Sequence, residues 1–319
     1  MKQWIDQFQN CHILVIGDCM IDEYVWGKVD RISPEAPVPV VEVKRDNATL
    51  GGAGNVVNNL ATLKASVSIV GTVGQGNNGK RLVEMFQAIG VNTHGLIEDN
   101  TRSTTIKTRI MASEQHVLRI DRETAHPVSV HVADGIIRNI QHCIQDVHLV
   151  IVSDYGKGLL TQNVLQSIMQ MAERHQKVVM VDPKGFNYEK YQGASLITPN
   201  RKEASQAANM PINDMPSMIT AGKNIIKAIG LKRLLITCGK DGMVLFEPDQ
   251  SPYHIETRAK QVFDVSGAGD TVVSVMGLAL AAGADFRKAA TLANCAAGIV
   301  VGKVGTATIT QAELQDAIG

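Results

Sequence analysis

The sequence predicts an α/β protein whose mostly parallel sheet is covered by helices on both faces. Short runs of β-branched residues alternate with amphipathic segments along most of the chain, and the runs end in Gly, Asp or Asn. Strands that are apolar along their whole length are buried on both faces, which is typical of parallel sheets linked by helices. No repeat or linker divides the 319 residues, so we expect one large domain.

The individual elements follow in order from these patterns. The expected strands are 12–18, 66–71, 148–154, 177–182, 194–200 and 233–239. The expected helices are 53–64, 78–89, 129–144, 161–175, 215–229, 268–283 and 286–302. The last two helices are rich in Ala and Gly, and such small residues permit close helix packing.

Two regions interrupt the alternation of strands and helices. Residues 23–45 contain three prolines and no helical period, and residues 102–121 alternate polar and apolar side chains as a half-exposed antiparallel pair does. We interpret them as extra strands that form a small flap beside the main sheet. A pair of ordinary edge strands explains the same periodicity equally well.

The composition excludes several classes of partner. Lys+Arg and Asp+Glu balance at 31 each, so no overall field attracts nucleic acid or an anionic membrane. The N-terminus lacks the apolar core of a signal peptide, and the apolar, uncharged stretch 271–284 is shorter than the roughly 20 residues that span a bilayer. Five scattered cysteines and no zinc-ligand spacing indicate a cytoplasmic protein with reduced thiols.

Polar residues gather where the expected strands end. Ligands of open α/β sheets bind beyond the carboxyl ends of the parallel strands. Each polar residue alone is compatible with a turn or a helix cap, but so many at one edge favour a polar ligand. These residues are Asp18, Asp22, Asp154, Lys157, Asp182, Lys184, Asn200 and Glu203, with Gly71 and Gly239 at two further strand ends.

Two glycine-rich stretches precede expected helices. Residues 74–79, GQGNNG, match the dinucleotide fingerprint of dehydrogenases, but a lone GxGxxG is weak and we interpret it as a loop that opens a helix. Residues 51–61, GGAGNVVNNLA, allow the backbone to approach a ligand closely, and Asn55 and Asn58 add amides that suit sugar hydroxyls. A tight strand–helix junction is the alternative for the second stretch.

The stretch SGAGD, 266–270, carries the strongest chemical signal. Glycines at a helix N-terminus expose unpaired backbone N–H groups at the positive end of the helix dipole, which suits the charge of a transferred phosphoryl group. Asp270 would repel phosphate if binding were its only task, so we predict that it is a base that deprotonates an attacking hydroxyl. A helix-capping role for Asp270 is the alternative.

Together these motifs resemble the ribokinase-like (PfkB) carbohydrate kinases. GGAGN is similar to their first signature, DVSGAGDT to their second, TPNRKE to their N-x-x-E element and TCGKDG to their nucleotide loop. Within that family, residues 17–41 and the SDYGKG and DPKG stretches most resemble the bacterial D-glycero-D-manno-heptose-7-phosphate kinases of lipopolysaccharide core precursor synthesis. In many bacteria such a kinase is fused to an adenylyltransferase, and we expect no adenylyltransferase domain in residues 1–319.

The resemblance implies a ribokinase-like three-layer sandwich with a β lid from about 23–45 and 102–121. It also implies phosphorylation of O1 of the heptose 7-phosphate by ATP and Mg²⁺. The implied catalytic residues are Asp270 and the anion hole Gly267, Ala268 and Gly269. The implied nucleotide-binding residues are Asn200, Glu203 (with Mg²⁺, through water), Thr237, Gly239, Gly242 and Asn294. The implied sugar-binding residues are Asp18, Asp22, Gly52 and Asn55, with Lys157, Lys184, Arg109 and Arg119 as candidates for the 7-phosphate.

Some expectations stay open at this point. Many family members have Thr where this chain has Val265, so a monovalent-cation site beside the second signature is an open expectation. Surface solvation explains either arginine as well as phosphate binding does. An exposed lid strand at 38–43 suggests a homodimer. The alternative functions are a fructokinase, ribokinase or nucleoside kinase, and a non-catalytic sugar- or nucleotide-binding regulator.

Overall fold

A computed structural model describes residues 1–112, 115–257, 262–303 and 305–318 of the chain. In this part of the chain the main sheet has nine strands in the order β13-β12-β11-β10-β9-β8-β1-β4-β5, parallel except for β12 and β13, which pair antiparallel at one edge. The α/β prediction with a mostly parallel sheet is confirmed. Its strands are β1 His12–Gly17, β4 Ser66–Gly74, β5 Asn92–Asp99, β8 Leu149–Ser153, β9 Val178–Asp182, β10 Leu196–Ile197, β11 Leu234–Thr237, β12 Met243–Phe246 and β13 Tyr253–Ile255.

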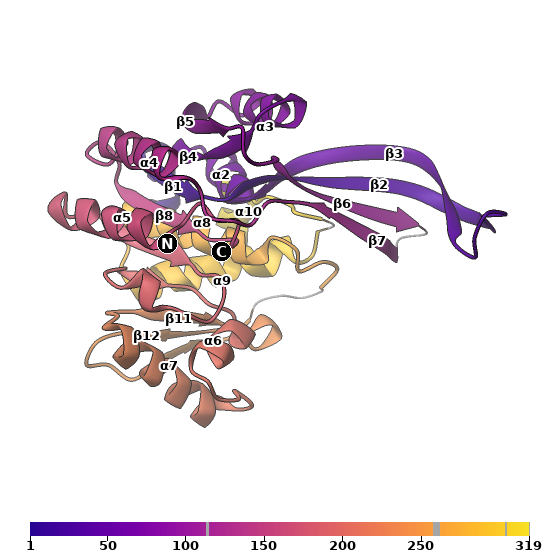
Figure 1. The fold of residues 1–319 in the computed structure, drawn as a ribbon. Helices are drawn as coiled ribbons and strands as arrows, with labels where there is room; N and C mark the ends of the chain where they lie inside the picture. The colour runs from indigo at the N-terminus through magenta and orange to yellow at the C-terminus, as the bar shows by residue number, and fades with distance from the viewer. Residues whose placement is uncertain (113–114, 258–261, 304, 319) are drawn as a thin grey trace.

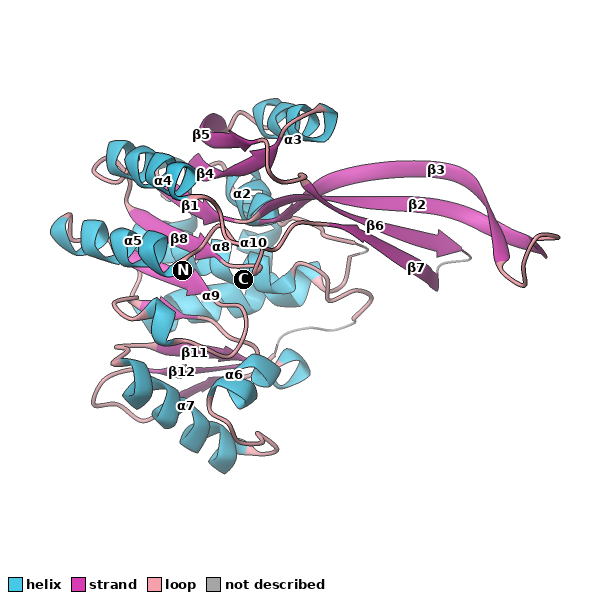
Figure 2. Ribbon diagram, viewed as in Figure 1, coloured by secondary structure: helices cyan, strands magenta, loops and turns pink. Residues whose placement is uncertain are grey.

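Helices cover both faces of this sheet (Figures 1 and 2). One face packs against α1 Lys2–Ile5, α2 Ala53–Thr62, α3 Asn77–Ala88, α8 Ala268–Ala281, α9 Phe286–Val300 and α10 Gln311–Ala317. The other face packs against α4 Val130–Cys143, α5 Gln162–Arg174, α6 Arg201–Ala207 and α7 Met215–Ile229. Short 3₁₀ turns occupy Phe8–Asn10, Glu189–Tyr191 and Gly239–Asp241. None of the helices in the described ranges has the length and apolarity to cross a membrane.

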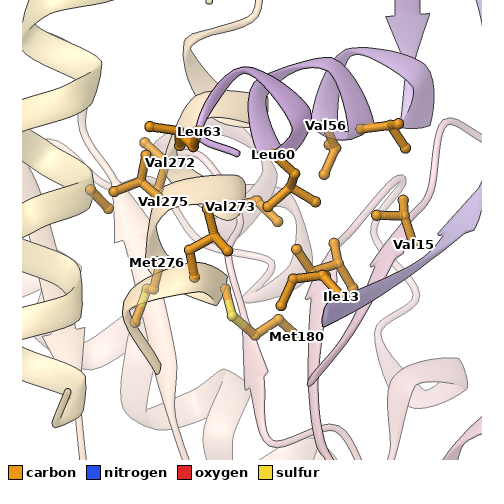
Figure 3. Packing of buried hydrophobic residues seen from close by; sticks show 14 of the residues in the cluster. Ile13, Val15, Val56, Leu60, Leu63, Met180, Val272, Val273, Val275 and Met276 are labelled. Carbon is orange, nitrogen blue, oxygen red and sulfur yellow. The ribbon is translucent and has the colours of Figure 1, made fainter. Parts of the chain in front are cut away.

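The core on the α8 face explains why that helix is uncharged over most of its length. Val272, Val273, Val275 and Met276 of α8 are buried between α2 and strands β1 and β9 (Figure 3). A helix that is apolar on all sides is stable only when it is surrounded by protein. Because its middle part is buried in the core, α8 has a fixed position, and its first turn lies at the carboxyl edge of the sheet.

The predicted strands and helices are largely confirmed, with one marked difference in length. The strand expected at 194–200 is regular only over Leu196–Ile197, with an isolated bridge between Asn200 and Thr237, because Pro199 has no N–H to donate and α6 begins at Arg201. The predictions missed β5, β12 and β13, and also the short helices α1, α6 and α10. Strand β5 carries polar residues at a sheet edge, and its sequence therefore lacks the apolar run that marked the central strands.

Four strands form a second sheet that projects beyond the main one (Figure 1). They are β2 Cys19–Ile32, β3 Pro39–Gly52, β6 Thr105–Ala112 and β7 Gln115–Arg122, in the order β3-β2-β6-β7. The two regions that break the sequence alternation thus pair with each other rather than with the edges of the main sheet. We call these four strands the flap sheet. Its strand β2 follows β1 after one residue and β3 leads directly into α2, so the flap sheet rises from the edge where the candidate site residues lie.

Gly17 at the end of β1 shows how tightly this edge is built. A Cβ at residue 17 would lie 2.2 Å from the carbonyl oxygen of Ser153 in β8. We expect Gly17→Ala to lower the free energy of unfolding by about 1–3 kcal/mol, because the two strands must separate to admit the methyl group. Urea unfolding measures this change. Gly90→Ser is the control, because a Cβ at residue 90 meets no atom within 4 Å, although its positive φ adds some strain. Equal stability of Gly17→Ala and the wild type would contradict the prediction.

Candidate active site

The site lies where the strand order of the main sheet reverses. Strand β1 lies between β4 and β8. Strand β5 follows on the outer side of β4, and strands β9 to β13 follow in order on the outer side of β8. A crevice forms outside the carboxyl ends at such a switch point. Two adjoining cavities of about 180 and 300 Å³ lie beside this point, beyond the ends of strands β8 to β11 and next to α8, and both are lined by Thr237 and Gly269.

The start of α8 stands between the two cavities. Gly267 is the N-cap residue with φ of 78°, a left-handed conformation that favours glycine. A Cβ on Gly267 would lie 2.7 Å from Nδ2 of Asn55. The N–H groups of Gly269 and Asp270 have no acceptor in the described residues, whereas Ala268 N–H donates to the carbonyl of Val265. Of the predicted anion hole, Gly269 therefore keeps a free N–H group beside both cavities and Ala268 does not, while the free N–H group of Asp270 is an addition to the prediction.

Asp270 is buried at this helix start and is held by two donors. Asn55 Nδ2 donates to its Oδ2 at 2.7 Å, and the Tyr155 hydroxyl donates to its Oδ1 at 2.8 Å. Burial raises the pKa of Asp270 to about 6, although both hydrogen bonds oppose that rise. A carboxyl group with this pKa is ionised at neutral pH yet basic enough to accept a proton.

Polar contacts between α2 and α8 fix the position of Asn55. Asn59 Nδ2 donates to the Asn55 carbonyl at 2.9 Å, and Thr271 Oγ1 of α8 donates to Asn59 Oδ1 at 3.1 Å. Ser274 Oγ contacts the carbonyl oxygens of Val56 and Asp270. The first and second signature stretches are therefore one packed unit, although about 210 residues separate them in the sequence.

Gly52 and two strand-end aspartates organise the backbone around the site. Gly52 has φ of 57°, and a Cβ there would lie 2.5 Å from the Asp18 carbonyl oxygen. Asp18 Oδ2 accepts the N–H groups of Tyr155 and Lys157, both at 3.0 Å. Asp154 accepts from the Gly156 N–H, from Lys190 and from the Tyr191 hydroxyl. Each of these carboxylates holds the loop that delivers Tyr155 to Asp270.

The N-x-x-E element lies across the smaller cavity from Asp270. Asn200 Oδ1 accepts the Glu203 N–H at 3.0 Å and Glu203 Oε2 accepts the Asn200 N–H at 3.1 Å, so the pair forms a capping box at α6. Lys184 Nζ lies 3.4 Å from the other oxygen of Glu203. Lys184 therefore sits with the residues predicted to serve the nucleotide and not with the flap sheet.

Asp182, one of the polar residues predicted to gather at the strand ends, adds a further carboxylate to this cavity. It lines the cavity with Asp270 and Glu203. Burial, together with repulsion from those two groups, raises the pKa of Asp182. No group of three or more His, Cys, Asp and Glu side chains within the described ranges is arranged to hold a metal by itself.

The larger cavity is mostly apolar. Val262, Val265, Val272, Ala297 and Val301 line it together with Gly239, Gly242 and Asn294. Gly242 has φ of 82° and lies against the Ile255 carbonyl oxygen, and the Asn294 amide donates to the Glu256 carbonyl at 2.7 Å. Asn294 thus shapes the wall of the cavity through Glu256, the residue that follows β13. A slot of this size and polarity accommodates a flat heteroaromatic ring.

Most predicted phosphate-binding cations on the flap side already have carboxylate partners. Arg109 contacts Asp22 at 2.7 Å, and the other pairs are Lys157 with Glu123 at 2.6 Å and Arg119 with Asp121 at 2.8 Å. The Arg119 side chain is 56% exposed, which agrees with the solvation alternative for that residue.

Lys107 and Tyr155 are the two side chains that our sequence reasoning missed. Lys107 Nζ lies 5.7 Å from the centre of the Tyr155 ring and makes no ion pair with the described residues. Lys107 is half-buried, and this burial lowers its pKa. The alternation of residues 102–121 assigned Lys107 and Arg109 to one face of the strand, but only the pairing with β2 shows that this face points at Asp22.

The glycines of GQGNNG have a packing role instead of a nucleotide role. A Cβ on Gly79 would lie 2.0 Å from the Gly74 carbonyl oxygen, and a Cβ on Gly74 would lie 2.4 Å from the Thr104 N. These glycines let the start of α3 close onto the turn that precedes β6. The loop interpretation is therefore supported over the dinucleotide fingerprint.

The structural neighbours of the chain share this architecture. The structure of Arabidopsis thaliana ribokinase complexed with ribose and ATP superposes with a TM-score of 0.75 at 20% identity and covers 97% of this chain and 98% of that one. Phosphofructokinase-2 from Escherichia coli in complex with potassium superposes with a TM-score of 0.78 at 17% identity and covers 96% and 97% of the two chains. The fold is ribokinase-like, as predicted.

Relatives found by sequence have a higher identity to this chain than these two structures have. The bifunctional protein HldE of Desulfatibacillum aliphaticivorans is 53% identical over 98% of this chain, and that of Geobacter metallireducens is 46% identical over 98%. The chain spans 64% of the length of each of these two relatives. Residues 11–313 match the family described as pfkB family carbohydrate kinase. With the second-signature aspartate buried at the start of α8 and the ribokinase-like fold around it, the chain belongs to the pfkB family of carbohydrate kinases.

Proposed function

We propose that the chain transfers the γ-phosphoryl group of ATP to O1 of D-glycero-D-manno-heptose 7-phosphate and forms the 1,7-bisphosphate. The observation that carries the phosphotransfer is Asp270, a buried carboxyl with a pKa of about 6 at a helix start between two cavities. The family membership and the names of the relatives support the sugar-kinase class. The heptose is proposed from the resemblance of residues 17–41 and of the SDYGKG and DPKG stretches.

In this proposal the nucleotide and its Mg²⁺ occupy the two cavities, and the sugar lies next to them on the flap side of Asp270. The adenine lies in the apolar cavity near Asn294 and Thr237, with the nucleotide loop at Gly239 and Gly242 below the ribose. The phosphates extend toward α8, where the N–H groups of Gly269 and Asp270 stabilise the charge of the transferred group. The sugar lies between Asp270 and the flap sheet, where Asp18, Asp22 and Gly52 contact its hydroxyls. Asn55, predicted as a fourth contact, is fully buried and holds Asp270 instead. Asp270 removes the proton from O1 as that oxygen attacks phosphorus.

The residues present suit a Mg²⁺ ion in the smaller cavity. Magnesium prefers oxygen ligands, and in kinases it is held by one or two carboxylates, water and substrate phosphates rather than by a complete protein cage. Glu203 and Asn200 supply oxygen atoms at the cavity edge, and Lys184 beside them adds a positive charge for the phosphates. When bound there, the ion would supply positive charge that offsets the negative charge of the phosphates.

Lys107 is the feature of the site that best supports a phosphorylated sugar. A half-buried ammonium group without an ion pair is costly unless an anion joins it. Asp22 and Asp121 lie opposite Lys107 in the flap sheet, while Lys157 and Arg119 add positive charge nearby. The phosphate group of the sugar would pair with the Lys107 ammonium, and Arg109, Lys157 and Arg119 would be secondary cations.

We expect Lys107→Met to raise the KM for heptose 7-phosphate roughly tenfold to a hundredfold, the range for losing a hydrogen bond to a charged group. The KM for ATP should change little, because Lys107 lies on the flap sheet. Steady-state kinetics with each substrate varied in turn measures both values. Lys28→Met, at an exposed position of β2, is the control. An unchanged KM for the sugar phosphate would contradict the role given to Lys107.

We also propose a homodimer in the cytoplasm. Exposed apolar side chains gather on the flap sheet and its connecting turn, and a second copy of the chain would cover them. They include Ile32, Val38, Val43 and Leu118, each more than half exposed.

ADP release with Mg-ATP tests the function across a panel of acceptors. Turnover selective for heptose 7-phosphate supports the proposal. Turnover only with ribose, fructose or adenosine would keep the phosphotransfer and reassign the acceptor. Absence of turnover with any acceptor, combined with measurable binding of ATP or sugar, would favour a non-catalytic regulator.

A further inference from the structure

We propose that Tyr155 is a positioning residue for Asp270, whose hydroxyl group fixes the orientation of that carboxylate and keeps it ionised for proton transfer. The inference rests on the proposed phosphotransfer and extends it to a residue outside the two signature stretches. Its basis is the 2.8 Å hydrogen bond from the Tyr155 hydroxyl to Asp270 Oδ1.

Two donors on opposite oxygens hold the carboxylate plane. Asn55 binds Oδ2 from α2, and Tyr155 binds Oδ1 from the loop after β8. A carboxylate held at only one oxygen rotates about its Cβ–Cγ bond, and misplacement of a reacting group by about 1 Å can cost a hundredfold in rate. Each oxygen has a second lone pair, so the carboxylate still accepts a proton from the sugar.

Two further contacts hold Tyr155 itself, one at its backbone and one at its ring. Its backbone N–H donates to Asp18 Oδ2, and the Lys107 ammonium lies over its ring. Burial, followed by the charge of Asp270, raises the pKa of Tyr155 well above its usual value, so its hydroxyl remains a donor throughout the working pH range. The ring therefore connects strand β6 of the flap sheet to the start of α8.

The charges that face Asp270 do not replace this hydrogen bond. Asp22 of β2 and Asp182 at the end of β9 repel the ionised carboxylate, and Lys107 of β6 attracts it. The donors that favour the anion are Asn55 and Tyr155, and both lower the pKa of Asp270 against the effect of burial. Removal of either donor consequently moves that pKa upward.

The test is Tyr155→Phe, which deletes the hydroxyl and keeps the ring. Because the base must be ionised, we expect the acid limb of the kcat profile to move from near pH 6 to about one pH unit higher. The substrates titrate alike with every variant, so the difference between variants reports the enzyme group. We expect kcat to fall more than tenfold at pH 6, where the carboxyl becomes mostly protonated and loses its orientation, with little change in either KM. Tyr188→Phe is the matched control, because that buried hydroxyl has no partner in the described residues.

Two further measurements separate the inference from its alternatives. In the Asp270→Asn background, Tyr155→Phe should cause little additional loss, because the tyrosine acts through the carboxylate. In ¹³Cγ-aspartate-labelled protein, the signal that Asp270→Asn removes should titrate at higher pH in Tyr155→Phe. This readout needs no turnover, so it tests the tyrosine even if the proposed acceptor is wrong. An unmoved acid limb and an unmoved carboxyl titration would overturn the inference, as would a full additive loss in the double variant.

Discussion

Asp270→Asn is expected to lower kcat by roughly 10²–10⁴, the contribution typical of a general base. The substitution keeps the size of the side chain and removes its ability to accept a proton from O1. ATP binding should change little, because the apolar cavity lies on the other side of α8. Single-turnover kinetics and ATP titration measure the two quantities separately.

The pH profile supplies the control for this result. The wild type should lose activity as the pH falls through about 6, because the folded protein raises the pKa of Asp270 and the base becomes protonated below that value. Asp270→Asn should lose this acid limb together with most of its activity. Asp285→Asn is the same exchange at the N-cap of α9, where Asn caps as well as Asp, and it should leave kcat unchanged. Wild-type kcat in Asp270→Asn would remove this carboxylate from the mechanism.

The sequence predicted the central strands well because their apolar runs reflect burial on both faces. It failed for β5 and β13, which form the two edges of the sheet and contain polar residues, and for β12, whose apolar run is only four residues long. The proline-rich region at 23–45 could be recognised as an interruption of the alternation. Strand β3 extends beyond this region to Gly52, however. The register between β2 and β3 depends on contacts between segments that are distant in sequence, and periodicity does not encode those contacts.

The site could be predicted where a motif carries its own geometry, and not where distant segments meet. Glycines before a helix predicted the environment of Asp270, and the capping box of Asn200 and Glu203 follows from local spacing. Tyr155 and Lys107 belong to no such motif. Their relation to Asp270 arises only when the loop after β8 and the flap sheet fold against α8. The sequence also does not show which cations already have ion-pair partners. In the structure Arg119 pairs with Asp121, whereas Lys107 makes no ion pair with the described residues and can bind a phosphate.

Gly269→Val is expected to lower kcat roughly 10²–10³-fold while leaving the free energy of unfolding unchanged or slightly higher. A Cβ at residue 269 meets no protein atom within 4 Å, so the valine would project into the cavities that residue 269 lines. It would obstruct the N–H groups of Gly269 and Asp270, and loss of one such donor typically costs this much in rate. Helix propensity meanwhile favours Val over Gly. Ala281→Val, near the end of the same helix and outside both cavities, is the control. Activity and stability thus move in opposite directions if the start of α8 serves the phosphoryl group, whereas a purely structural glycine would lose stability first.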